Sequence, residues 1–170
     1  MGWVTLTLRK TELKRSHADY QKQLLDISRE KRRMARQNHY EQTIARNQGL
    51  MDLDIAYQNF KIQSDAAMKD IDSAWTVNAD GSKTLDQQYY EGAQHGYNTL
   101  KQDYEQQKLR LQEEMDQEMA RLEDEANEME TMLDQEQVQV EAQLEAISAE
   151  IEAVGEAISS QIQASTIKLS

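Results

Sequence analysis

The chain has 170 residues, a net charge of −12, no proline and no cysteine. This length fits one domain, and the absence of proline is typical of long uninterrupted helices, because an interior proline costs a helix about 3 kcal/mol. The absence of cysteine excludes disulfides, thiolate metal sites and a cysteine nucleophile. A hydrophobic content of 38% with 10 aromatic residues indicates a coiled coil or extended helix rather than a globule with a thick core.

The first residues contain no recognisable targeting signal. The opening MGWVTLTL is apolar only as far as Arg9, which is too short for a secretory signal, and Leu6 stands where a myristoylation motif needs Ser or Thr. No run approaches the ~18 apolar residues of a membrane span. We therefore expect no membrane span. The compartment stays open between the cytoplasm and a secreted or viral assembly that is exported without a cleaved signal.

Residues 1–8 read as an apolar N-terminal arm. Val4, Leu6 and Leu8 alternate with Thr5 and Thr7, which is strand periodicity in β-favouring residues. A lone strand has no partner in a helical chain. The arm is therefore either the start of a helix or a segment that pairs with a neighbour.

Residues 9–75 are predicted to form a basic-to-mixed helix. Leu13, Tyr20, Ile27 and Met34 repeat every seven residues, which is a heptad seam. The seam weakens between residues 28 and 43 and then broadens into two stripes, which indicates contact with more than one neighbouring helix. One stripe comprises Ile44, Met51, Ile55 and Ile62, and the other comprises Leu53, Phe60, Ala67 and Ile71.

Residues 84–168 are predicted to form a second, acidic helix. Thr84-x-x-Gln87 has the pattern of a capping box, which marks a helix start. The apolar residues that follow are spaced by threes and fours, as in a coiled coil. They are Leu111, Met115, Met119, Leu122, Ala126, Met129 and Leu133, and then Val140, Leu144, Ile147, Ile151, Val154, Ile158 and Ile162.

Between the helices, residues 76–83 read as a turn rather than a calcium loop. A calcium loop with Gly81 sixth would need acidic residues first and twelfth, but these positions hold Thr76 and Gln87. Asn, Asp and Gly favour turns for reasons of their own. A small β-hairpin that pairs residues 75–77 with 82–84 could decorate the bend.

Charge predicts how the two helices pair. Residues 1–46 hold 11 Lys or Arg and 5 Asp or Glu, whereas residues 102–156 hold 3 and 18. A fold about Asp80 places residue i near residue 160 − i, so that opposite charges meet. We therefore predict an all-α fold, an elongated antiparallel two-helix coiled-coil hairpin. The expected charge pairing joins Arg29, Arg32, Arg33 and Arg36 to Glu123, Asp124, Glu125 and Glu128.

No pattern indicates an enzyme, a cofactor or a metal site. His17, His39 and His95 are far apart in the sequence, and no phosphate loop, nucleophile elbow or dinucleotide fingerprint occurs. The basic run at 29–36 resembles a nucleic-acid contact, but the net charge of −12 argues against it. We expect neither catalysis nor a small-molecule substrate.

Weakly charged apolar residues gather at the chain ends and near the turn. The end segments keep an apolar stripe where a solvated tail would not, and seven of the ten aromatics lie between residues 57 and 104. Aromatic residues there either close the hairpin or form a docking head. The predicted interface residues are Trp3, Val4, Leu6, Leu8, Leu53, Phe60, Ile71, Trp75, Tyr89, Tyr90, Tyr97, Ile158, Ile162, Ile167 and Leu169.

These features predict a non-enzymatic structural coiled-coil subunit. It would self-associate or pack into a filament, tube, secretion apparatus or virion component, with copies of itself or other protein subunits as partners. The alternative is a stalk or adaptor that docks on a larger machine, such as a secretion-system ATPase or export complex. A basic first helix folded on an acidic second one resembles the stalk and filament proteins of secretion systems, in architecture rather than in any specific motif.

Overall fold

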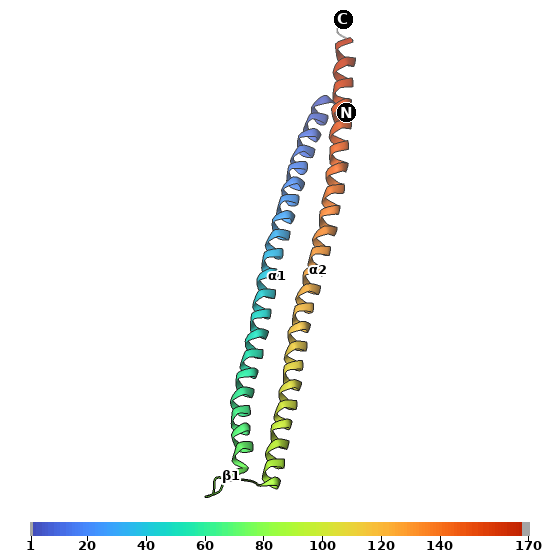
Figure 1. The fold of residues 1–170 in the computed structure, drawn as a ribbon. Coiled ribbons are helices and arrows are strands. Elements are labelled where there is room, and N and C mark those ends of the chain that lie inside the picture. The colour runs from blue at the N-terminus through green and yellow to red at the C-terminus, as the bar shows by residue number, and fades with distance from the viewer. Residues whose placement is uncertain (1, 168–170) are drawn as a thin grey trace. The chain divides into compact units, whose positions relative to one another are not determined.

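The computed structural model describes residues 2–167, and the side chains of residues 2–165. It contains two long helices, α1 (Trp3–Ser73) and α2 (Gln87–Ile167), joined by the strands β1 (Trp75–Val77) and β2 (Lys83–Leu85) (Figure 1). The two helices pack against each other, and the strands form a two-stranded antiparallel sheet. The predicted helical hairpin with a small β-hairpin at its turn is confirmed.

The chain divides into two compact units. The terminal unit contains residues 3–38 of α1 and 124–167 of α2. The turn unit, His39–Glu123, contains the remainder of both helices and the β-hairpin. In each unit one face of α1 lies against one face of α2.

Two contacts set the register of the helices in the turn unit. The ring of Phe60 stacks on that of Tyr104, with centroids 4.4 Å apart and planes 14° from parallel. A Cβ atom on Gly49 would lie 2.6 Å from the sulfur of Met115, so the two residues face each other. In both pairs the residue numbers add to 164.

The residues of the turn unit that face the opposite helix, here called its inner face, repeat every eleven positions. They are buried or half-buried, and they pair across the two helices in the same register of 164. An eleven-residue repeat favours a slight right-handed supercoil. On α1 and the residue that follows it, the inner face comprises Gln42, Ala45, Gly49, Leu53, Ala56, Phe60, Ser64, Ala67, Ile71 and Ala74; on α2 it comprises Tyr90, Ala93, Tyr97, Leu100, Tyr104, Lys108, Leu111, Met115, Met119 and Leu122.

In the terminal unit the inner face instead repeats every seven residues, which favours a left-handed supercoil. Several of its half-buried positions on α1 are polar, namely Lys10, His17 and Lys31. The predicted heptad Leu13, Tyr20, Ile27 and Met34 lies on this face together with Leu6, Lys10, His17, Leu24 and Lys31. The α2 side comprises Leu133, Gln137, Val140, Leu144, Ile147, Ile151, Val154 and Ile158.

Small residues on α1 face large residues on α2 through much of the turn unit. In the register set by Phe60 and Tyr104, Ala45 lies opposite Met119 and Ala67 opposite Tyr97. Matching a small side chain with a large one fills the space between helices without voids or strain. This matching explains why Gly49 is accepted inside a helix, where glycine costs about 1 kcal/mol relative to alanine.

The turn is a three-residue β-hairpin loop. Trp75 pairs with Leu85 and Val77 with Lys83, one residue away from the predicted pairing with residues 82–84. Asn78 N–H donates to Ser82 O, and Gly81 N–H donates to Asn78 O. Gly81 has φ +82°, the left-handed conformation that ends such a loop and that glycine adopts without strain.

Both helix starts differ from the predicted ones. The 1–8 arm is helical from Trp3, and Thr7 Oγ1 donates to Trp3 O at 2.8 Å, so its β-favouring residues are accommodated in α1. Thr84 lies in β2, and Asp86 caps α2 by accepting the backbone N–H of Tyr89 at 3.0 Å. Aspartate at this position satisfies an N–H group that has no partner in the helix, so α2 begins at Gln87.

Gly49→Ala and Gly96→Ala should have different effects on stability. A Cβ at residue 49 would lie 2.6–3.0 Å from three atoms of Met115, whereas nothing lies within 4 Å of one at residue 96. Gly96→Ala should therefore raise the free energy of unfolding by about 1 kcal/mol. At residue 49, overpacking of about 1–3 kcal/mol should cancel or reverse that gain.

Thermal and urea unfolding followed by circular dichroism measures both changes. Equal stabilisation by the two substitutions would contradict the close approach of Gly49 and Met115.

Candidate interaction surfaces

Three groups of exposed apolar side chains stand out in the described chain. The terminal surface comprises Trp3, Val4, Leu8 and Ile162. The outer stripe comprises Tyr40, Ile44, Met51, Ile55 and Ile62 on α1 of the turn unit. The tip surface comprises Trp75, Val77 and Tyr89 around the turn.

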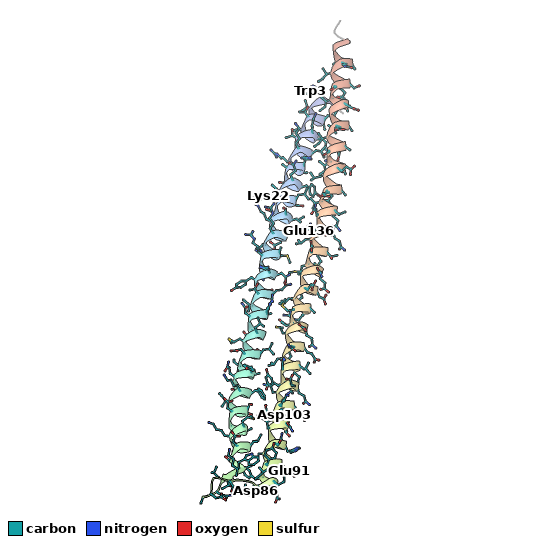
Figure 2. All side chains as sticks on the ribbon, in the orientation of Figure 1. Trp3, Lys22, Asp86, Glu91, Asp103 and Glu136 are labelled. Atoms are coloured by element: carbon teal, nitrogen blue, oxygen red, sulfur yellow. The ribbon has the colours of Figure 1, made fainter. Side chains whose placement is uncertain are left out.

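Trp3 of the terminal surface lies beside α2, whereas Val4 and Leu8 lie on the opposite side of α1, because each is two residues from Leu6 and thus about 200° around the helix from it. Figure 2 shows Trp3 at the start of α1, beside α2. Leu6 and Ile158 are half-buried on the facing sides of the two helices, while Trp3, Val4 and Leu8 are exposed. Of the predicted interface, Leu169 and the side chain of Ile167 lie outside the described residues.

At the tip, the predicted aromatic residues divide between two roles. Trp75 and Tyr89 are exposed. Tyr90 and Tyr97 are half-buried on the inner face, opposite Ala74 and Ala67 in the register of 164. Only the first two are therefore available to a partner, and the other two pack within the hairpin.

Of the two predicted stripes on α1, one is used inside the chain. Leu53, Phe60 and Ile71 were predicted as interface residues, but they are half-buried and face α2. The other stripe is left exposed as the outer stripe, and the predicted interface omitted it. The sequence does contain a signal for the outer stripe, namely the spacing of its apolar residues, which is the same as the spacing on the inner face.

Charge joins the helices in the terminal unit through two pairs that lie outside the predicted set. Arg9 donates to Glu150 Oε1 at 2.7 Å from Nη2 and 3.1 Å from Nε, and Lys31 bonds Asp134 and Gln137. The hydrogen bond to Glu150 raises the pKa of the Arg9 guanidinium. Both ion pairs are at least partly exposed, so solvent screens them and each contributes little to stability.

The predicted arginines bond within α1 instead. Arg29 pairs with Asp26 and Arg33 with Glu30, three residues earlier on the same helix. Arg32 donates to Ser28 Oγ, and Arg36 donates to the carbonyl of Arg32. The ion pairs of Arg29 and Arg33 are therefore made with carboxylates of their own helix, and Glu123 belongs to the turn unit.

The register of the helices differs from the predicted one in the turn unit. The residue numbers of paired strand residues add to 160, as predicted, whereas those of the helix pairs in the turn unit add to 164. The offset of four residues is about one helical turn. In the terminal unit the contacting residue numbers add to 159 for Arg9 and Glu150 and to 165 for Lys31 and Asp134.

The carboxylate of Asp80 in the turn loop forms hydrogen bonds within the loop. Asp80 Oδ1 accepts the N–H of Ser82 at 2.9 Å and the hydroxyl of Ser82 at 2.6 Å. Both bonds lower the pKa of Asp80, and the bond from the Ser82 hydroxyl has the larger effect. Among the described residues no group of three His, Cys, Asp or Glu is placed to hold a metal ion. The loop geometry is that of an Asx-type turn.

Comparison with protein-family models, with curated proteins and with solved structures found no match. Over residues 2–167, neither helix has a stretch that is long and apolar enough to cross a membrane. The side chains and their exposure therefore carry the functional argument.

Ser82→Ala should raise the pKa of Asp80 toward the ordinary value of about 3.9, because it removes the hydroxyl that stabilises the carboxylate. A carboxyl whose pKa is lower in the folded chain contributes stability above its ordinary pKa and loses it as pH falls through the folded value. Carboxyl titration by NMR of the two proteins measures the shift. An Asp80 pKa that is identical in both would contradict the bond from Ser82.

The stacked rings should be energetically coupled. A double-mutant cycle of Phe60→Leu and Tyr104→Leu should give a coupling of about 0.5–1.5 kcal/mol, measured by urea unfolding. Tyr57 provides a matched control, since its ring lies 6.4 Å from that of Tyr104 and is tilted by 54°. The same cycle on Tyr57 and Tyr104 should give a smaller coupling, and a Phe60 coupling near zero would contradict the stack.

Proposed function

We propose that this chain is a non-enzymatic structural coiled-coil subunit that self-associates, or packs with other protein subunits, into a larger assembly. The observation that carries the proposal is the outer stripe of α1, an apolar surface outside the contact with α2. Contiguous exposed apolar surface marks interaction sites in proteins that are not destabilised. The terminal surface supports the same proposal, because it adds a second exposed apolar group.

The chemistry of the chain favours protein partners. A net charge of −12 opposes binding to nucleic acid, which attracts clustered positive charge. Arg29 and Arg33 belong to the most basic part of the sequence, and both form ion pairs with carboxylates of their own helix. Apolar contact, rather than charge, is the attraction that these surfaces offer to a neighbour.

The tip surface supports a second candidate function. Trp75, Val77 and Tyr89 are exposed at the turn, and aromatic residues are common anchors of protein interfaces. A stalk or adaptor would dock this end on a larger machine, such as a secretion-system ATPase or export complex. It would need no contact between copies of the chain.

Sedimentation equilibrium of the purified chain distinguishes a self-associating subunit from a stalk or adaptor, because it reports mass independently of shape. A structural subunit should give species at multiples of 19.7 kDa, with an average mass that rises with concentration. A mass of 19.7 kDa across the micromolar to millimolar range would contradict self-association of the chain.

A further inference from the structure

The outer stripe is a regular second face on α1. Its five side chains are between 47 and 69% exposed. Tyr40, Met51 and Ile62 are spaced by eleven residues, and so are Ile44, Ile55 and Ala66. This is the same repeat as that of the inner face of the turn unit. The stripe therefore runs parallel to the intrachain seam rather than winding around the helix.

The stripe lies far from α2. At about 3.67 residues per turn, its centre is about 150° around the helix from the line of Gly49, Phe60 and Ile71. A partner helix that covers it must also repeat every eleven residues, because a seven-residue repeat drifts off such a face. A second copy of this chain supplies a helix with that repeat.

We propose that the outer stripe pairs antiparallel with the outer stripe of a second copy, so that residue i lies opposite residue 106 − i in the sequence. This inference rests on the proposed self-association and names the face that performs it. The register places Ile44 opposite Ile62 of the second copy and Met51 opposite its Ile55. The contact is isologous, with a twofold axis near the level of Leu53.

The same register matches side-chain size. Tyr40 lies opposite Ala66 of the second copy, a large residue against a small one, as on the inner face. A parallel register would instead place Tyr40 on Tyr40 and Ala66 on Ala66, which crowds one level and leaves another empty. Size matching therefore favours the antiparallel arrangement.

The positions immediately beside the stripe carry no charge over its central length, and Asp52 and Asp54 lie one position further around the helix. Asn47 and Gln58 are on one side, and Gln48 and Asn59 are on the other. In an antiparallel twofold pair each border meets its own counterpart, so Asn47 faces Gln58 of the second copy, and Gln48 faces its Asn59. Amides both donate and accept hydrogen bonds. The first charged border residues, Arg36, Lys69 and Asp70, lie beyond the ends of the stripe.

The available area meets the requirement for a dimer. Covering five side chains that are about half exposed removes on the order of 100 Å² each, and thus about 1,000 Å² over two copies, which is the lower limit for a specific interface. The bordering amides add to this area. The contact is accordingly that of a reversible dimer, or of one joint repeated in a larger assembly.

Cysteine cross-linking tests the register, since the chain has no cysteine of its own. Ile44→Cys and Ile62→Cys are made separately, mixed and oxidised. The mixture should form a disulfide-linked dimer. Each variant alone should not, because the cysteines of two paired copies of the same variant would be offset by about 27 Å along the helices. Dimers of either variant alone, without the mixed dimer, would show a parallel register and overturn the proposal.

A charge substitution tests the face independently of cross-linking. Ile55→Glu should raise the apparent Kd for self-association at least about tenfold, because the twofold axis introduces the charge twice. Leu109→Glu is the matched control, since Leu109 is an exposed leucine on α2 of the same unit and should leave the Kd unchanged. Circular dichroism verifies that both variants keep their helix content.

The outcomes separate this inference from the proposed function. If the unmodified chain self-associates but Ile55→Glu and Leu109→Glu behave alike, the outer stripe is not the interface and the structural role stands. If the unmodified chain is monomeric at every concentration, the pairing of outer stripes and the self-association on which it rests are both wrong.

Discussion

A helix that packs against a single other helix can bury only one face, and this limit governs how the chain distributes its apolar side chains. Among the described residues the buried hydrophobic side chains are few: Leu13, Ile27, Ala56, Ala74, Leu122 and Val140. Each lies on the one seam between α1 and α2. Any apolar residue on another face of these helices is exposed within the hairpin, and the outer stripe and the terminal surface follow directly from that geometry.

The seam between the helices is packed with different kinds of residues in the two units. In the turn unit, small residues of α1 such as Ala45 and Gly49 face methionines of α2, so shape complementarity carries the contact. In the terminal unit, Lys10 and Lys31 occupy seam positions, and the amine of Lys31 reaches Asp134 and Gln137 at the edge. Polar seam residues cost stability but favour one pairing over its alternatives.

Much of the fold could be predicted because it depends on local signals. The Asp80-Gly81 turn, the heptad from Leu13 and the charge contrast between the halves together specify an antiparallel hairpin. The helix register could not be predicted, because the chain between the strands and the helices moves it by one turn. The eleven-residue repeat is not evident in the sequence, because several of its positions hold small or polar residues instead of large apolar ones. Ala45, Gly49 and Ser64 are examples, and each is half-buried against α2. The outer stripe was visible in the sequence, but only the exposure of its residues distinguishes it from the inner face.

The two repeat lengths give each unit its own tolerance to slippage. In the terminal unit, moving α1 along α2 by seven residues would restore the pattern of inner-face positions. In the turn unit, the same pattern would return only after a displacement of eleven residues. A mispaired state of the turn unit therefore lies further along the helix from the native alignment than a mispaired state of the terminal unit.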